Sequence, residues 1–388
     1  MNFTVERSCM AKAVKVAMVA TSKSKVIPEM TGVLIEVNAD KGFLTVTGTD
    51  SFVQIQSRLK CEHISEGGLA VFPPIISQML HLLDGETVEI SSSAVENNMA
   101  NIKSGSCVYC VPLYQVNSFP KISPEYPSEY ITVKGINSLI HHTVFATDDS
   151  NSGVNANGMQ CVKLVFQNGN TTAEAVNNAV AARAVNLHGS DGNLELVLHQ
   201  SVLDKLTDAI GQKDNVYLGI RDKLAYFITE NTVFTALRYM GKTLDVNQVF
   251  SRITPEYKAT VDSKALYDTI SNVMAIFGDN DDRCVNVSVG DGQITVSSKT
   301  ATGGATASTA ATNTVETDPS GFNYNPKWLL DCFKLLTGPA TIRLDRRGCL
   351  LVEANHNRYC VMPRGPVVIR KKETKKPKKT SSKVKAAA

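Results

Sequence analysis

The sequence predicts an α+β fold made of three tandem copies of one module, each with two helices and an antiparallel sheet. Two repeated features carry this prediction. A Thr-Val pair followed by a helical segment recurs at Thr4, Thr132 and Thr260, 128 residues apart both times. A second helical segment closes each unit and ends near a glycine of the kind expected after a helix C-terminus, and these are Gly85, Gly211 and Gly338.

Apolar residues with the period of an α-helix predict the first helix of each unit. They are Met10, Val14 and Ala17 in the first unit, Ile136, Leu139, Ile140 and Val144 in the second, and Leu266, Ile270, Val273 and Phe277 in the third. Alternating runs such as GVLIEVNADKGFLTVTGTD follow each helix, and Asn-Gly or Asp-Gly pairs supply turns. This pattern predicts antiparallel strands.

Proline-containing stretches, FPKISPEYPSEY and ITPEYK, separate the units. We therefore expect domains at residues 1–126, 127–253 and 254–368. Residues 369–388 have too few apolar side chains to fold, which predicts a basic disordered tail. The polar stretch TATGGATASTAATNT in the third unit is either a flexible connection between strands or a weak edge strand, and we favour the flexible connection.

Charge is distributed unevenly along the chain. The net charge is +3, but residues 369–388 hold nine Lys or Arg and one Glu, so the tail carries +8 and the rest carries −5. A protein that held DNA by its whole surface would be basic throughout, because affinity comes from many contacts to phosphate. Any DNA contact of the folded body must therefore be local or weak.

The remaining composition indicates a folded protein of the cytoplasm. Hydrophobic residues make up 43% of the chain, no apolar run reaches the length of a bilayer span, and the start lacks the order of a signal peptide. Nine cysteines without a framework spacing fit reduced thiols, so we expect no disulfide.

No motif of a catalytic or cofactor site is present: there is no P-loop, G-x-G-x-x-G, H-E-x-x-H or G-x-S-x-G. No cofactor and no metal are expected, and the chain is not expected to be an enzyme. His141 and His142 are adjacent on a helix and point in different directions, which favours a structural or solvent-facing role.

Two further patterns are more simply explained by structure than by metal binding. Cys107 and Cys110 have zinc-site spacing, but they lie in an alternating run with no second ligand pair nearby, so an edge strand is expected. The acidic stretch from Asp279 to Asp282 resembles the start of a calcium loop, yet Arg283 stands at a ligand position and the loop glycine is missing.

Basic side chains recur on or beside the predicted helices. If these helices line one surface, that surface is a sparse basic track able to hold DNA by its phosphates without reading sequence. Ordinary solvated helix faces explain the charge pattern equally well. The candidate DNA-facing residues are Lys12, Lys15, Lys23, Lys25, Lys134, Lys205, Lys264, Lys327 and Lys334.

In order along the three units, several segments resemble the bacterial DNA polymerase III beta subunit, the DNA sliding clamp. They are MNFTVER before a helix, TGVLIEV and LTVTGTD, TVFATDDSNSGVNANGM, GFNYNPKWLLD, and YCVMPR. The resemblance covers residues 1 to about 364. It implies a DNA clamp fold that forms a ring, in which two copies join head to tail as a homodimer around duplex DNA.

The resemblance also implies a processivity factor in the cytoplasm, associated with the nucleoid. A ring that encircles duplex DNA independently of sequence needs no tight contacts, and a polymerase docked on it stays at high effective concentration near the primer end. DNA polymerase and the clamp loader are the implied partners, docking through short peptide motifs, and no membrane is involved.

By position, the resemblance implies a hydrophobic partner-peptide pocket between the second and third domains. Its walls would be Ala156, Ala175, Asn177, Asn178, Val180, Arg252, Ile253, Val361, Met362, Pro363 and Arg364. The chain departs from the family here, because Ala175 to Val180 replace a stretch that usually reads Thr-Asp-Gly-His-Arg-Leu. We therefore expect an altered peptide or a reduced set of partners.

For the dimer contact, the family pairs an edge strand of the first domain with the third domain. Val108 and Cys110 are the matching candidates on one side, and Ile276 and Phe277 on the other. The rival interpretation is a monomeric DNA-binding scaffold that acts through the basic tail. It predicts a monomer mass and loss of all DNA binding when residues 369–388 are removed.

Overall fold

The computed structural model describes residues 1–93, 98–122, 125–148, 157–211, 215–279, 282–301, 303–317 and 320–365. Ala156 of the expected pocket and the expected tail, residues 369–388, lie outside the described residues.

Helices and strands follow one another in three similar groups. The first group holds β1 (Asn2–Glu6), α1 (Arg7–Met18), β2 (Val33–Asn38), β3 (Phe43–Thr49), β4 (Val53–Lys60), β5 (His63–Glu66), β6 (Gly68–Phe72), α2 (Ile75–Leu82), β7 (Thr87–Ser93), β8 (Met99–Ser104) and β9 (Cys107–Pro112). The second group holds β10 (Ile131–Val133), α3 (Ile136–His141), β11 (Cys161–Gln167), β12 (Asn170–Val176), β13 (Val180–Asn186), β14 (Leu194–His199), α4 (Gln200–Ile210), β15 (Val216–Arg221), β16 (Leu224–Ile228) and β17 (Thr232–Leu237).

A short helix, α5 (Val246–Ser251), connects the second group to the third. The third group holds β18 (Tyr257–Asp262), α6 (Ser263–Met274), β19 (Val285–Gly290), β20 (Gln293–Lys299), β21 (Gly304–Ala310), β22 (Thr312–Val315), β23 (Phe322–Tyr324), α7 (Pro326–Phe333), β24 (Pro339–Leu344), β25 (Leu350–Ala354) and β26 (Asn357–Val361). The predicted α+β class, with two principal helices per unit on antiparallel sheet, is confirmed. The domain boundaries stay a prediction.

Strands from different groups join the same sheets. An eight-stranded sheet has the order β10-β15-β16-β17-β4-β3-β2-β6, and a nine-stranded sheet has the order β14-β11-β12-β13-β26-β25-β24-β18-β22. The antiparallel pair β4·β17 therefore joins the first and second groups, and β13·β26 joins the second and third. The chain ends contribute two smaller sheets, β5-β1-β7-β8-β9 and β21-β20-β19-β23.

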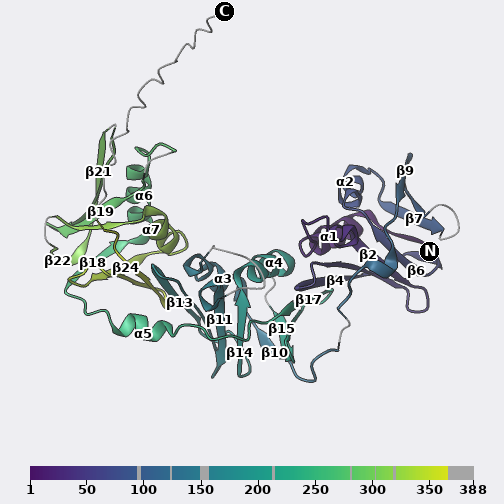
Figure 1. The fold of residues 1–388 in the computed structure, drawn as a ribbon, viewed down its shortest axis with the longest axis horizontal. Helices are drawn as coiled ribbons and strands as arrows, with labels where there is room; N and C mark the ends of the chain where they lie inside the picture. The colour runs from purple at the N-terminus through teal and green to yellow at the C-terminus, as the bar shows by residue number, and fades with distance from the viewer. Residues whose placement is uncertain are drawn as a thin grey trace, which may run out of the picture.

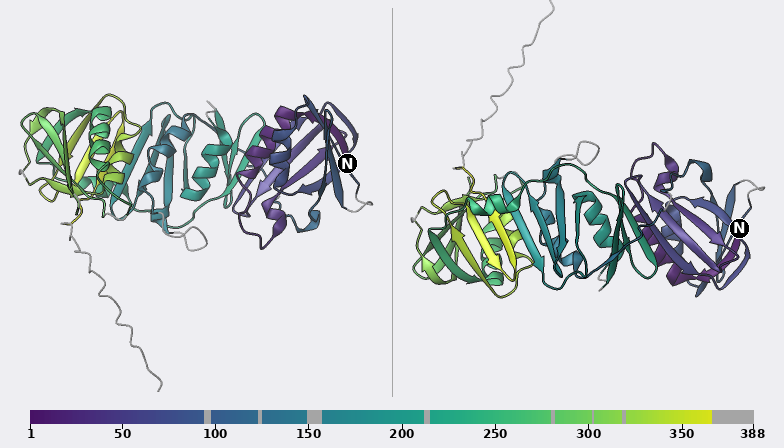
Figure 2. Two further views of the ribbon diagram at one scale, coloured as in Figure 1. Left: turned by 90° about the horizontal axis from the view of Figure 1, so that it is seen from above. Right: turned by 90° about the horizontal axis from the view of Figure 1, so that it is seen from below.

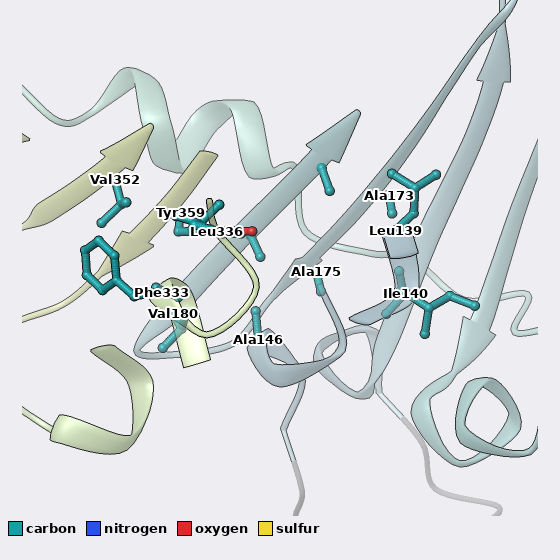
Figure 3. Packing of buried hydrophobic residues seen from close by; sticks show 14 of the residues in the cluster. Leu139, Ile140, Ala146, Ala173, Ala175, Val180, Phe333, Leu336, Val352 and Tyr359 are labelled. Carbon is teal, nitrogen blue, oxygen red and sulfur yellow. The ribbon is translucent and has the colours of Figure 1, made fainter. Parts of the chain in front are cut away.

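Together the groups form an arc with helices on its concave side and sheets on its convex side (Figure 1). The views from above and below show the three groups in a row, with the N-terminus in the group at one end (Figure 2). One hydrophobic core continues across the second junction, where Ala146 and Val180 pack near Phe333 and Tyr359 (Figure 3). Because this core is shared, the groups hold a fixed relative position.

Polar side chains and glycines end or begin several helices as the sequence suggests. Asp262 accepts a hydrogen bond from the backbone N–H of Ala265 at the start of α6, and Gly211 follows α4 with a φ of 57°. The expected glycines after α2 and α7 are wrong. Helix α2 ends at Leu82 and α7 ends at Phe333, so that Gly85 and Gly338 lie further on, in bends before the next strands.

The preferred interpretation of TATGGATASTAATNT as a flexible connection is wrong. Gly304–Ala310 forms β21, paired along its length with β20, and Thr312–Val315 forms β22. Small and β-branched side chains alternate between more and less exposed positions along β21, and Ala305 and Ala307 pack against the core. Backbone pairing with β20 thus outweighs the weak strand propensity of alanine and glycine.

The two junctions are covered differently on the convex side. At the second junction α5 lies over the sheet, and Val246, Phe250 and Ile253 form a small core with residues that include Leu351 and Cys360. At the first junction an extended connection crosses the sheet instead. Its Ile122 exchanges two hydrogen bonds with the Gln54 side chain, at 2.8 and 3.1 Å.

We expect Phe250→Ala to lower the free energy of unfolding by about 3 kcal/mol or more, because it empties the small core beneath α5. Phe250 is only 3% exposed, and the guanidinium carbon of Arg358 lies 4.8 Å from the centre of its ring. Phe52, which is 44% exposed, provides the matched control, and Phe52→Ala should cost less than about 1 kcal/mol. Urea unfolding measures both, and equal losses would contradict this account of the junction.

Candidate nucleic-acid interface

The predicted DNA-facing lysines lie on or next to helices of the concave side (Figure 1). Most of them are exposed, and these are Lys12, Lys15, Lys23, Lys25, Lys134, Lys264, Lys327 and Lys334. Lys12 and Lys15 belong to α1, while Lys23 and Lys25 follow it. The spacing of these lysines along the arc gives few cations per group, so the track is sparse.

Two of the lysines have carboxylate partners. Lys205 of α4 is half-buried and pairs with Asp50, which lies between β3 and β4 in the neighbouring group. Lys264 pairs with Asp268 one turn along α6, and its ammonium lies 5.4 Å from the centre of the Tyr267 ring. The ion pair of Lys205 with Asp50 therefore connects α4 to the first group. Because Asp50 partly neutralises the Lys205 ammonium, less of that positive charge is available to a ligand.

The structure divides the predicted pocket residues into two sets. Ala175, Val180 and Val361 are at most 2% exposed and face the helix-side core. Asn177 closes the turn before β13, accepting hydrogen bonds from the backbone of Ala179 and Val180 at 2.8 Å each. These residues position the backbone of the junction but present little side chain to a partner.

The second set lies near the surface where β26 ends. Met362 is 39% exposed, and its sulfur lies 3.7 Å from the thiol of Cys349, which neighbours Ile253 in the core beneath α5. Burial raises the pKa of Cys360 in this core to about 12, so that its thiol stays protonated and apolar. Asn178, Arg252, Pro363 and Arg364 are exposed or half-buried.

Arg364 also lines a cavity of about 640 Å³ between α6 and α7. Two predicted DNA-facing residues, Lys327 and Lys334, line the same cavity. Sequence reasoning placed these three residues in two separate sites. The structure brings them together because the chain returns from β26 to the start of α7, where the Arg364 N–H bonds to the Asn323 carbonyl at 2.7 Å.

The predicted dimer residues lie at the two far ends of the chain's arc. Val108 and Cys110 are exposed on β9, which ends its sheet and confirms the expected edge strand. Ile276 and Phe277 follow α6 and are half-buried, and the ideal Cβ position of Gly303 lies 3.6 Å from the Ile276 Cδ1 atom. Ile276 therefore lies beside the start of β21, the edge of the other terminal sheet.

Sequence reasoning named β21 only as the less favoured alternative, a weak polar edge strand, and the structure confirms that alternative. It missed the exposed apolar face of α2, where Ile75 is 44% and Leu82 is 72% exposed. The run IISQMLHLL gave a signal, since a helix that is apolar on nearly every side is expected to be covered by another surface.

The rejected metal and catalytic candidates have structural partners. His142 lies beside Tyr359 with its Nδ1 2.6 Å from the phenol oxygen, whereas His141 is exposed. Asp282 accepts a hydrogen bond from Arg364 at 2.9 Å, and the two residues before it lie outside the described residues. Among the residues that the structure describes, no cluster of three or more metal-ligating side chains occurs. All nine cysteines are free thiols.

Comparison with known proteins finds relatives of this chain among beta sliding clamps. Residues 1–123 match the family model described as DNA polymerase III beta subunit, N-terminal domain. The beta sliding clamp of Halalkalibacterium halodurans is 22% identical over 356 residues, covering 87% of this chain and 90% of that protein. The beta sliding clamp of Staphylococcus aureus is 21% identical over 347 residues, with the same two coverages.

Solved structures agree over the whole arc. The DNA polymerase III beta subunit of Thermotoga maritima superimposes with a TM-score of 0.84 at 18% identity, covering 94% of this chain and all of that one. The DNA polymerase sliding clamp of Bacillus subtilis gives 0.83 at 18% identity, covering 95% and 100%. Three similar modules in an arc, with helices inside and sheets outside, are therefore the fold that this chain shares with these DNA clamp structures. At the level of sequence, the match to a family model covers residues 1–123, the N-terminal domain of DNA polymerase III beta subunits, and the longer matches to beta sliding clamps are 21 to 22% identical.

No helix of the described segments combines the length and apolar character needed to cross a membrane.

The half-buried His142 should make stability depend on pH. Burial lowers the pKa of His142 below its usual 6.5, with the neighbouring His141 adding to the effect. The unfolded chain then binds a proton more readily than the folded chain, so stability falls as pH drops from 6.5 toward the lowered pKa. We expect His142→Gln, which can still bond to Tyr359, to show a smaller loss of stability between pH 7 and 5 in urea titrations. An unchanged pH dependence would exclude this contribution.

Proposed function

We propose that the protein is a DNA sliding clamp. Two copies join head to tail into a closed ring around duplex DNA and tether a DNA polymerase, which gains processivity. One observation carries the proposal. The chain has two internal junctions of the same kind, in which a strand of one group pairs with a strand of the next. Its first and third groups each have an unpaired edge strand, and together these two strands could form a third junction between copies.

The internal junctions use corresponding strands. The last strand of the second group, β17, pairs with β4 of the first, and the last strand of the third group, β26, pairs with β13 of the second. The strands left over in these two roles are β9, the last strand of the first group, and β21, which corresponds to β4 and β13. Each ends its own sheet within the described chain. Unpaired edges of this kind are templates for another chain.

The register of the first junction can be counted from its hairpins. Val53 closes the hairpin before β4, accepting a hydrogen bond from the N–H of Asp50, and Thr232 closes the hairpin before β17. Gln56, three residues after Val53, pairs with Val233, one residue after Thr232.

The second junction repeats this register. Val180 closes the hairpin before β13, and Asn357 begins the second strand of the hairpin β25–β26. Arg183, three residues after Val180, pairs with Arg358, one residue after Asn357. Since the counts agree, the same geometry joins each pair of neighbouring groups.

Applied to the free edges, the counts give the register of the contact between copies. Gly303 closes the hairpin before β21 and Cys107 closes the one before β9. Thr306 of one copy therefore pairs with Val108 of the other, and Gly304 pairs with Cys110.

The faces of the two edges agree with this register. Val108 and Cys110 are exposed on β9, as are Thr306 and Gly304 on β21, so exposed positions meet exposed positions. The half-buried Tyr109 would meet Ala305 on the helix side, close to Ile276. The apolar face of α2 lies on the same end of the chain as β9 and would be covered by the second copy, as α4 is covered by α1 at the first junction.

A closed ring accounts for the charge of the chain. The exposed lysines on the inner helices attract phosphate, but the acidic body and the pairs of Lys205 with Asp50 and Lys264 with Asp268 keep the attraction weak. Because a closed ring is linked to the duplex by topology, weak contacts suffice, and they let the ring slide. We infer that seven of the candidate lysines face the duplex in this arrangement, namely Lys12, Lys15, Lys23, Lys25, Lys134, Lys205 and Lys264. Lys327 and Lys334 line the cavity between α6 and α7.

The segment directly after β26, at Met362, Pro363 and Arg364, is the proposed docking place of partner peptides from the polymerase and the clamp loader. The clamp contributes no catalytic step of its own, and its place is on chromosomal DNA in the cytoplasm. Relatives that match over 356 residues do not favour the rival monomeric scaffold acting through residues 369–388, because the match lies largely in the folded body.

We expect light scattering of the protein without residues 369–388 to give twice the mass of one chain at micromolar concentration. After loading by a clamp loader, this dimer should stay on nicked circular DNA during gel filtration and leave when the circle is cut. A monomer at these concentrations, or equal retention on circular and linear DNA, would overturn the ring.

Cross-linking tests the register. Strand partners have Cα atoms 4.5 to 5.5 Å apart, within the range that a disulfide spans. We expect Gly304→Cys to form a disulfide with the native Cys110 of a second copy under mild oxidation. Ser308→Cys is the matched control, since its side chain is also exposed on β21 but lies four positions further along the edge. Cross-linking of Ser308→Cys but not of Gly304→Cys would show a different register.

A further inference from the structure

We propose that the cavity between α6 and α7 binds an acidic peptide segment with an adjoining aromatic anchor. The inference rests on the proposed function and specifies the chemistry of a partner. The cavity measures about 640 Å³ and lies beside Arg364, at the end of the proposed docking surface. We call it the α6/α7 cavity, and it is lined by Tyr267, Met274, Asp282, Arg283, Asn325, Pro326, Lys327, Trp328, Leu330, Asp331, Lys334 and Arg364.

One part of its wall is apolar and preformed. Trp328, Leu330 and Tyr267 are half-buried and pack against the main core, so their positions are fixed before any ligand arrives. Trp328 is the single tryptophan of the chain. Aromatic and aliphatic walls held in this way suit an aromatic side chain of a peptide, because the anchor loses water without disturbing the protein.

The rim is basic on a body that is otherwise acidic. Four cations line the cavity against two carboxylates, whereas residues 1–368 carry a net charge of −5. Lys327 in the first turn of α7 and Lys334 directly after its last residue are exposed, and they form no ion pair within the described part of the chain. These ammonium groups can pair with carboxylates of a peptide, and charge complementarity of this kind raises both the association rate and the specificity.

Arg364 is held at the rim by the chain itself. Its Nη1 donates to the Asp282 carboxylate and to the Arg283 carbonyl, both at 2.9 Å, while its backbone N–H bonds to the Asn323 carbonyl. The Asp282 pair neutralises Arg364 and keeps it at the edge of the cavity. Arg283, Lys327 and Lys334 therefore supply the attraction, and a peptide must meet a rim whose shape is already set.

A phosphate backbone fits this cavity less well than a peptide. Asp282 and Asp331 line it together with the cations and would repel a chain of phosphates, whereas a peptide can place its carboxylates against the lysines alone. The apolar walls have no counterpart in a phosphodiester contact. Binding of a labelled oligonucleotide tests whether the cavity holds DNA instead.

Binding is tested with the full chain by fluorescence anisotropy of two labelled peptides. One is Ser-Gly-Phe-Phe-Asp-Glu-Asp, and the other carries Asn-Gln-Asn in place of the acidic residues. We expect the acidic peptide to bind about tenfold more tightly at low salt and to lose this advantage at high salt, because the contacts are exposed charges. Equal affinity for the two peptides would overturn the proposal.

Two variants locate the site. Lys327→Glu combined with Lys334→Glu should weaken the acidic peptide about tenfold or more and leave the amide peptide nearly unchanged. Trp328→Ala should weaken both peptides. Lys41→Glu is the matched control, since Lys41 is an exposed lysine in the hairpin before β3 and lies outside the cavity. Loss of acidic-peptide binding in Lys41→Glu to the same degree would show general charge repulsion instead.

The mass of each variant and the binding of a labelled thymidine oligonucleotide complete the test. Oligonucleotide binding that depends on Lys327 and Lys334, without binding of the acidic peptide, would assign the cavity to DNA and overturn the proposal. A monomeric protein that still prefers the acidic peptide would refute the ring while leaving this site standing. A dimer that shows no preference for the acidic peptide would refute this site and leave the ring standing.

Discussion

Backbone hydrogen bonding between neighbouring groups is the constraint on which the rest of this structure depends. The pairs β4·β17 and β13·β26 make each group the continuation of its neighbour's sheet, so the groups cannot rotate independently. Their helices therefore stay on the concave side of the arc (Figure 1). The same constraint leaves β9 and β21 without partners at the ends of the chain. Ring closure in our proposal is the third use of one interaction.

The two internal junctions show that this interaction tolerates different chemistry around it. At the second junction the convex face is apolar, and α5 covers it with Phe250 and Ile253. At the first, the polar Gln54 bonds to the backbone of an extended connection. Since main-chain pairing fixes the register, side chains at the junctions are free to vary. This freedom is consistent with a retained fold at 18% identity to the clamps of Thermotoga maritima and Bacillus subtilis.

Charge placement follows a similar division of roles. The inner lysines are few, and Asp50 and Asp268 neutralise two of them. Such a surface would bind DNA poorly if contact alone had to hold it. At the α6/α7 cavity, by contrast, Lys327 and Lys334 lie beside aromatic walls, which favours a definite ligand over a sliding one. The inner surface and the cavity thus differ in how strongly they are built to hold a ligand.

The sequence by itself determined the repeated architecture. The Thr-Val period and the apolar faces containing Met10, Ile136 and Leu266 predicted where the helices begin, because a helix that packs on a sheet needs an apolar stripe of fixed period. Two residues predicted on these faces, Val144 and Phe277, lie beyond the ends of α3 and α6. The edge position of Cys107 and Cys110 was also readable from alternation. Local patterning suffices for such features, since neighbours along the chain decide them.

Only the tertiary structure decided where these elements meet. From the sequence, an edge strand at β21 was only the less favoured of two interpretations, because its pairing with β20, and not its composition, makes it a strand. The burial of Ala175, Val180 and Val361 followed from the shared sheet, which turns these side chains toward the helices. Arg364, Lys327 and Lys334 came together across the third group although they are distant in sequence. A sequence records each residue's preference, whereas contacts between distant segments depend on sheet register and direction.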